Sequence, residues 1–271
     1  MKKTTMFLIG AAAAGAGLLY LTAPGRISRK AKKPFQDRNF AHRGLHTRDK
    51  SVPENSIAAF EEASKLGYGM ELDVQLSKDG EVVVFHDDTL NRVCGVDAGV
   101  CELSYDELHS LSLCGTKETI PLFSDVLKTV RGRGALIVEL KTGDRNTELC
   151  EKTYELLKGY SGEYCIESFN PFIVRWFRKN APEVVRGQLA CPPDGYDGAV
   201  STFTAFILSR TLLNFLARPQ FIAYKIGEKP FTVKLAEFLG AMKVCWTSHE
   251  WVNEKDNDVV IFEFYKPKLR F

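Results

Sequence analysis

Two acidic residues, Glu71 and Asp73, stand two positions apart in a short apolar stretch of the chain. A similar pair, Glu139 and Lys141, closes the apolar run 135–141. Because alternate residues of a β-strand point to the same side, both members of each pair can face the same space. Three carboxylates that converge from two strands would repel one another and force one of them to stay protonated. A hard divalent cation, Mg²⁺ or Ca²⁺, relieves such repulsion through its preference for oxygen ligands.

Two histidines also end β-like runs, each beside a second polar residue. His42 precedes Arg43, and His86 precedes Asp87, which could orient it. Two histidines at one rim can act as general acid and general base. Arg43 and Lys141 could hold a phosphate group, the arginine by bidentate donation and the lysine as a point charge. Together with a metal ion, these residue types indicate phosphodiester hydrolysis.

Further polar or aromatic residues stand at the ends of other runs. Ser168 and Trp246 are expected to contact substrate, although a strand-end hydrogen bond and a place in the core would also explain them. Glu54 opens a helical pattern and could either cap that helix or contribute to the site. His46 and His249 are expected to be ordinary surface residues.

Short β-prone runs alternate with amphipathic helical patterns, which is typical of a parallel sheet with helical crossovers. Eight such runs predict an α/β fold, a closed (β/α)₈ TIM barrel of about 250 residues. In that fold the carboxyl ends of all strands meet at one face, so the polar residues would gather there. The runs are 39–43, 70–76, 135–141, 164–169, 184–190, 221–226, 243–247 and 259–264.

One segment interrupts the alternation. Residues 78–118 are interpreted as an insertion in the loop after the second strand, where they either shape the site or form a structural flap. Within the insertion, Ser104 and Glu107 have the spacing of a capping box and predict a short helix. Helices between the strands are expected at 53–67, 146–159, 171–180, 204–217 and 231–240.

The N-terminus differs in composition from the rest. Residues 6–23 carry no charge and are about long enough to cross a bilayer, which needs about 20 apolar residues. The sequence thus predicts one N-terminal transmembrane helix as a membrane anchor in residues 1–23, a basic linker at 24–37 and a barrel domain at 38–271. A cleavable signal peptide is the alternative, although Pro24 follows the small residue at its plausible cleavage site. More positive charge lies after the span than before it, which favours a cytoplasmic catalytic domain and leaves an extracellular one open.

The charge distribution bears on possible partners. Of the 36 Lys and Arg residues, seven lie in residues 1–33, which leaves 29 basic against 34 acidic residues in the remainder. This mildly acidic remainder argues against a nucleic-acid partner, and the basic run fits a segment near anionic lipid. The seven cysteines are odd in number and contain no CxxC pair, which argues against a disulfide framework or a zinc knuckle.

The chain resembles the glycerophosphodiester phosphodiesterase family in five segments that follow the family's order over about residues 41–247. They are AHRGLH, PENSIAAFEEASKLGYGMELDVQLSKDGEVVVFHDDTLNRVCG, LIVELK, ESFNP and VCWT. The resemblance implies a barrel of the type found in phosphatidylinositol-specific phospholipase C, and cleavage of a glycerophosphodiester into glycerol 3-phosphate and an alcohol. It implies one divalent cation held by Glu71, Asp73 and Glu139, acid and base roles for His42 and His86, and phosphate contacts from Arg43 and Lys141.

Two alternatives to this activity stay open. One is lysophospholipase D-type hydrolysis of an acylated glycerophosphodiester, and the other is a non-catalytic barrel that binds lipid head groups. The sequence leaves undecided which histidine is the acid, and whether water or a neighbouring substrate hydroxyl attacks. It also departs from the family after Trp246, because Ser248 and His249 follow Thr247 where the family often has Val-Asn or Val-Asp.

Overall fold

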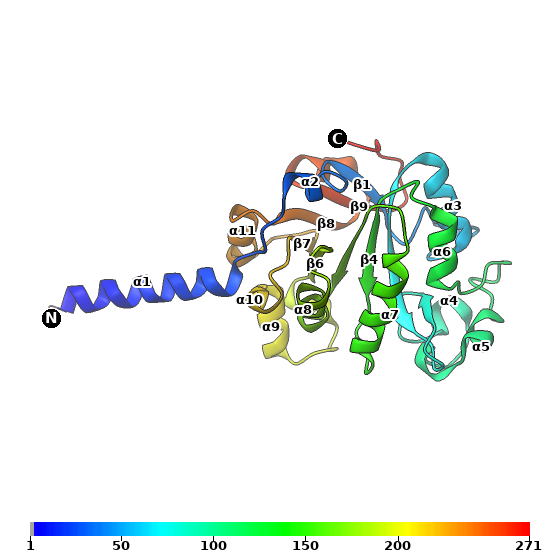
Figure 1. The fold of residues 1–271 in the computed structure, drawn as a ribbon, viewed down its shortest axis with the longest axis horizontal. Coiled ribbons are helices and arrows are strands. Elements are labelled where there is room, and N and C mark those ends of the chain that lie inside the picture. The colour runs from blue at the N-terminus through cyan, green and yellow to red at the C-terminus, as the bar shows by residue number, and fades with distance from the viewer. Residues whose placement is uncertain (1–2) are drawn as a thin grey trace.

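A closed barrel of parallel strands forms the body of the chain in a computed structural model, which describes residues 3–271, with side chains from residue 12 onward. Eight strands in this part of the chain pair side by side, and the first strand also pairs with the second, which closes the ring. The predicted barrel is therefore confirmed (Figure 1). Its strands are β1 (Arg38–Ala41), β2 (Gly69–Leu76), β4 (Leu136–Leu140), β5 (Tyr164–Ser168), β6 (Val185–Ala190), β7 (Phe221–Lys225), β8 (Met242–Ser248) and β9 (Val259–Phe262).

Helices cover the outside of this ring (Figure 1). The helix predicted at 204–217 is divided in two, because Thr211 has a φ of +50° and a left-handed residue cannot continue a right-handed helix. The short helix at 123–130 has no counterpart among the predicted ones. The helices of the barrel domain are α3 (Ile57–Leu66), α4 (Asn91–Cys94), α5 (Tyr105–His109), α6 (Phe123–Val130), α7 (Asn146–Lys158), α8 (Pro171–Asn180), α9 (Thr202–Ser209), α10 (Asn214–Ala217) and α11 (Phe231–Phe238).

The segment after β2 forms a small unit of its own. Strand β3 (Val82–Val84) turns back antiparallel to β2, and α4 and α5 follow it. The capping box predicted at Ser104 is present, since its backbone N–H donates to Glu107 Oε2 over 2.8 Å and its hydroxyl accepts the Glu107 N–H. Buried apolar side chains, among them Phe85 and Leu108, give this segment its own hydrophobic cluster.

Alternation along the strands divides the barrel into an outer apolar layer and an inner space. Outward residues such as Leu72 and Val138 pack against the helices, whereas Phe40 and Ile137 fill the interior. Further along the same strands, the inward positions change from apolar to charged residues. The amino-terminal half of the interior is thus a hydrophobic plug, and the carboxyl-terminal half carries the polar groups.

The N-terminal helix α1 (Lys3–Thr22) extends away from the barrel (Figure 1). Among the residues that the structure describes, no helix is both long enough and apolar enough to cross a membrane. The predicted transmembrane anchor is therefore wrong, and the membrane-anchored localisation inferred from it is not supported either. Residues 10–17 consist only of glycine and alanine, whose small side chains offer little apolar surface to lipid.

Hydrogen bonds attach the carboxyl end of α1 to the barrel domain. Arg218 Nη1 donates to the carbonyls of Tyr20 and Ala23 over 3.0 and 2.8 Å, and Asn214 Nδ2 donates to that of Thr22 over 3.0 Å. These bonds satisfy carbonyl groups that a helix end leaves without intrahelical partners. A four-residue helix, α2 (Arg29–Lys32), follows before β1, within the predicted linker. The predicted domain boundaries at residues 23 and 37 remain predictions.

Candidate active site

Three buried carboxylates meet inside the carboxyl-terminal half of the barrel. Glu71 and Asp73 lie on β2, and Glu139 lies on β4 directly opposite Asp73 in the strand register. Each residue offers a carboxylate oxygen within 4.8 Å of the others. The period-two spacing noted in the sequence thus brings together the three residues named there as metal ligands.

The electrostatics of this cluster favour a bound cation. Burial, followed by the charges of Asp73 and Glu139, raises the pKa of Glu71 well above its usual range. Burial would also raise the pKa of Asp73, but His86, Lys141 and Arg43 lower it well below its usual range. One carboxylate is therefore held charged while another is driven towards protonation, as expected when acids crowd together without enough positive charge.

The oxygen atoms of the cluster also fit a metal ion. Asp73 Oδ1 is buried and has no hydrogen-bond partner, so it has lone pairs available for a ligand. Glu71 Oε2 accepts the backbone N–H of Arg43 over 2.9 Å, and Asp73 Oδ2 accepts Asn55 Nδ2 over 2.8 Å, which orient the two carboxylates. A set of carboxylate oxygens is suited to a hard ion such as Mg²⁺ or Ca²⁺.

Two cations stand beside the carboxylates. Lys141 Nζ lies 2.9 Å from Glu139 Oε1 and 3.5 Å from Asp73 Oδ1. Arg43 Nε lies 3.5 Å from Asp73 Oδ2, and its Nη1 lies 2.7 Å from Glu54 Oε1. Although burial alone would lower the pKa of Lys141, Glu139 and Asp73 raise it above its ordinary value. Both side chains therefore carry full positive charge at the rim of the cluster.

His86 is held by a carboxylate next to it in the sequence. Its Nδ1 lies 2.6 Å from Asp87 Oδ1, and Arg92 Nε lies 2.6 Å from Asp87 Oδ2. Arg92 also binds Glu54 with two guanidinium nitrogens. When Nδ1 carries a proton towards Asp87, the Nε2 atom of His86 is left free to exchange one.

His42 follows β1 and lies between two acidic groups. Its Nδ1 is 3.0 Å from Glu263 Oε2, and its Nε2 is 4.0 Å from Glu71 Oε2. Burial lowers the pKa of His42 to about 4, although the hydrogen bond with Glu263 opposes that shift. His42 is therefore neutral at pH 7 and can act as a proton acceptor.

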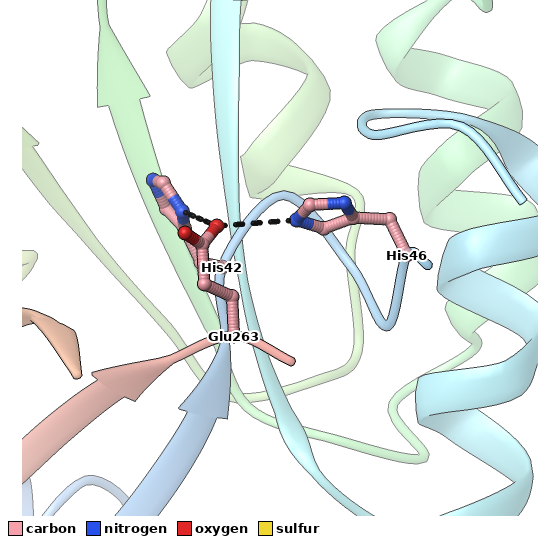
Figure 2. Close-up of side chains that lie close together, drawn as sticks. All are labelled: His42, His46 and Glu263. Atoms are coloured by element: carbon pink, nitrogen blue, oxygen red, sulfur yellow. Dashed lines mark hydrogen bonds and ion pairs between the residues drawn. The ribbon is translucent and has the colours of Figure 1, made fainter. Parts of the chain in front are cut away.

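Glu263 is one of two acidic residues that the sequence analysis overlooked. It follows β9, and three histidines surround its carboxylate (Figure 2 shows two of them). His42 Nδ1 and His46 Nε2 lie 3.0 and 3.3 Å from Oε2, and His249 Nε2 lies 2.8 Å from Oε1. Burial alone would raise the pKa of Glu263, but the histidines, His42 foremost, lower it well below its usual range. The rule that polar residues mark strand ends also applies to this position and would have found it.

The expectation that His46 is a surface residue is wrong. Its side chain is only 8% exposed, because it turns under the barrel rim towards Glu263 and packs edge-to-face on Phe264 with ring centres 4.9 Å apart. His249, by contrast, keeps 56% of its side chain exposed. Sequence spacing gave no sign of this arrangement, because the residues come from three different loops.

Ser168 is buried, whereas Trp246 remains partly exposed. The Ser168 hydroxyl is buried, donates to the Leu140 carbonyl over 2.7 Å and accepts the Asn170 N–H, while its neighbour Glu167 takes the inward position. Trp246 donates through Nε1 to the Ala223 carbonyl over 3.0 Å and remains partly exposed. Substrate contact by both residues remains a prediction, and the backbone bonds of Ser168 already explain its hydroxyl.

Glu167 is a second overlooked acid. It is buried on β5, opposite Glu139 in the strand register, and its Oε2 has no hydrogen-bond partner. Burial raises its pKa well above the usual range, and the charges of Glu139 and Asp73 add to the shift. Glu167 thus adds a fourth carboxyl group to the barrel interior, where a cation would reduce the repulsion among these groups.

Curated proteins resemble this chain over about half of its length. A glycerophosphodiester phosphodiesterase from Caldanaerobacter subterraneus is 37% identical over 161 residues, which is 55% of this chain and 65% of that protein. The human lysophospholipase D GDPD1 is 31% identical over 159 residues, which is 54% of this chain and 49% of that protein. The matched segments thus span less than two thirds of these curated relatives.

Solved structures share the fold. An Oleispira antarctica phosphodiesterase, determined in complex with the product sn-glycerol-3-phosphate, superimposes with a TM-score of 0.68 and 23% identity, covering 85% of this chain and 94% of that one. A Parabacteroides distasonis glycerophosphodiester phosphodiesterase gives 0.65 and 24%, covering 84% and 93%. The model of the glycerophosphoryl diester phosphodiesterase family matches residues 42–262. With that match over most of its length, the chain belongs to the glycerophosphoryl diester phosphodiesterase family.

Proposed function

We propose that this chain hydrolyses a glycerophosphodiester to glycerol 3-phosphate and an alcohol. The observation that carries the proposal is the buried cluster of Glu71, Asp73 and Glu139 with cations and histidines around it. Family membership supports the reaction class, and the product bound to the Oleispira relative supports the phosphate product. A non-catalytic barrel would not need to keep so many charged groups at its interior.

The phosphate would be held by a metal ion and by two cationic side chains. Glu71, Asp73 and Glu139 would hold one divalent cation, Mg²⁺ or Ca²⁺, which supplies Lewis-acid polarisation of a phosphoryl oxygen. Arg43 and Lys141, which stand at the same rim, would bind the remaining phosphoryl oxygens and neutralise negative charge that develops there. Their own ion pairs with the carboxylates keep them positioned before substrate arrives.

The two histidines would move the protons. Each has its Nδ1 beside a carboxylate, Glu263 for His42 and Asp87 for His86, so Nε2 is the nitrogen that faces the reaction in both. A neutral Nε2 takes the proton of the attacking hydroxyl group or water, and a protonated Nε2 gives one to the leaving alkoxide. The bond from phosphorus to the nucleophile forms as the bond to the leaving oxygen breaks, and the proton count balances.

An acylated substrate is the second candidate. Phe169 packs edge-to-face on both Tyr196 and Trp246, with ring centres 6.0 and 5.7 Å apart, and forms an aromatic wall beside the barrel mouth. The nearby helix α9 carries Phe203, which is 74% exposed, and the partly exposed Phe206. An apolar surface beside a phosphodiester site suits an acyl chain, and one relative of this chain is a lysophospholipase D.

The test is release of glycerol 3-phosphate from glycerophosphocholine by the purified chain, after treatment with EDTA and again with Mg²⁺ or Ca²⁺ restored. We expect release that depends on the metal and is lost in Glu71→Gln. The matched control is Glu61→Gln, the same change at an exposed position on α3. A Glu71→Gln protein with the full rate would show that the site is assigned wrongly.

A parallel assay with lysophosphatidylcholine distinguishes the two substrate classes. A preference of more than about tenfold in kcat/KM, roughly 1.4 kcal/mol of transition-state discrimination, decides between them. Binding of either compound without turnover would favour the non-catalytic barrel instead.

A further inference from the structure

The carboxylate of Glu263 lies at the centre of a second cluster, distinct from the acidic one. Ligand atoms of His42, His46 and Glu263 lie within 4.8 Å of one another, and the three side chains come from the ends of β1 and β9 and the loop after β1. Figure 2 shows the two imidazole rings approaching the same carboxylate from opposite sides. His249 reaches the other oxygen of this carboxylate.

Hydrogen bonding explains only part of this arrangement. His42 Nδ1 and His249 Nε2 each form a hydrogen bond with Glu263, at 3.0 and 2.8 Å. His46 Nε2 is buried and lies 3.3 Å from Oε2, yet it has no hydrogen-bond partner. A buried polar nitrogen without a partner is costly, and the Nε2 atom itself is shielded from water in a side chain that is 92% buried.

We propose that His42, His46 and Glu263 form a second metal site, for a divalent first-row transition ion such as Zn²⁺. Two imidazole nitrogens and one carboxylate oxygen are the donor set of many catalytic zinc sites, which keep a further position open. Imidazole favours such ions, whereas Mg²⁺ and Ca²⁺ favour oxygen. The acidic cluster contains only oxygen donors, so the two sites select different ions.

Aromatic packing holds the ligands in place. Phe264 contacts the His46 ring edge-to-face at 4.9 Å and stacks on the His249 ring at 6.0 Å. Its φ of +62° is strained for a bulky residue, and this turn directs Glu263 and Phe264 towards the histidines. His249 lies outside this group of mutually close ligand atoms and contacts the other carboxylate oxygen of Glu263, Oε1.

The site has a consequence for the proposed hydrolysis, and this consequence rests on the proposed function. His42 presents Nδ1 to Glu263 and Nε2 to Glu71. An ion ligated by Nδ1 displaces the proton from that nitrogen, so the neutral ring then carries its proton on Nε2. Occupation of the second site would therefore change His42 from a proton acceptor to a proton donor on the side that faces the acidic cluster.

The experiment measures Zn²⁺ binding by the full chain, stripped with EDTA and kept in excess Mg²⁺ to occupy the acidic cluster. We expect one tightly bound Zn²⁺ per chain, by equilibrium dialysis with metal analysis. The affinity should survive Asp73→Asn, which removes a ligand of the acidic cluster. It should fall at least about tenfold in His46→Gln, since even the outer partners of metal ligands contribute that much.

His109→Gln is the matched control, because His109 is an exposed histidine on α5 in the insertion. Substitution of Co²⁺ gives a second readout: visible absorption of a nitrogen-ligated ion, without the charge-transfer band of a thiolate, excludes binding by the free cysteines. If His46→Gln fails to fold, as judged by its thermal unfolding without metal, Glu263→Gln provides the same test.

Equal Zn²⁺ binding by the wild type and a folded ligand variant would overturn the inference, and so would the absence of Zn²⁺ binding by the wild type. Glycerophosphodiester hydrolysis with Mg²⁺ or Ca²⁺ alone, combined with no Zn²⁺ binding, would refute the second site and leave the proposed function intact. Zn²⁺ binding without hydrolysis of either substrate would refute the function and leave the site intact.

Discussion

Replacement of Glu71 by glutamine should weaken metal binding without destabilising the metal-free protein. The three carboxylates of the acidic cluster have ligand atoms no more than 4.8 Å apart. At an effective dielectric constant near 20, two unit charges at that distance repel by about 3.5 kcal/mol. Glu71 has two such neighbours, and its pKa is raised by burial and by their charges. This repulsion and burial drive the Glu71 carboxyl towards its neutral form, and the amide of glutamine has nearly the same shape and is neutral at every pH.

Without metal, Glu71→Gln should therefore unfold at the same denaturant concentration as the wild type or at a higher one, which is unusual for a change at a buried residue. With metal at 100 times its Kd, the wild type should gain about 2.7 kcal/mol from binding, and the variant should gain little. Urea unfolding of both proteins, with EDTA and with Mg²⁺ or Ca²⁺, measures both effects.

The control is Glu61→Gln, which should keep the stability gained on metal binding. Glu61 is exposed on the helix α3 and forms an ion pair with Lys65 there. A Glu71→Gln protein that gains as much as the wild type would show that Glu71 is not a ligand. A variant that is strongly destabilised in EDTA would show that repulsion within the cluster does not dominate.

Three further predictions follow from single contacts. Burial lowers the pKa of His42 from 6.5 to about 4, so at intermediate pH the unfolded chain binds a proton that the native state excludes. The free energy of unfolding is therefore at its full value above pH 6.5 and decreases as the pH falls towards 4. Between pH 7 and pH 5 the loss should be about 2 kcal/mol by urea unfolding, and His42→Gln should show a smaller one. Asp87→Asn should lower kcat by at least about tenfold with little change in KM, because it disturbs His86; an unchanged kcat would remove Asp87 from the mechanism. Gly187→Ala should destabilise by roughly 1–3 kcal/mol in chemical denaturation, since a Cβ there would lie 2.0 Å from the Phe221 ring, and a wild-type midpoint would contradict this.

Much of the barrel could be predicted because its strands are buried on both sides. Each predicted run overlaps one barrel strand, and the alternation of inward and outward residues placed Glu71 and Asp73 on one side correctly. The helix α6 was missed because its eight residues follow the insertion without a preceding cap, since Leu122 makes no capping hydrogen bond. The N-terminal anchor was inferred from the absence of charge, which is a weaker criterion than apolar surface.

The sequence by itself determined the strand order, the inward-facing pairs and the residue types of the acidic cluster, because these depend on local periodicity and on one global rule about strand ends. Only the tertiary structure decided which polar groups meet across the barrel mouth. The contacts of Glu263 with His42 and His46 join residues more than 200 positions apart, and they arise because β9 closes the ring against β1. Closure of the ring is a property of all eight strands together, so no local pattern records it.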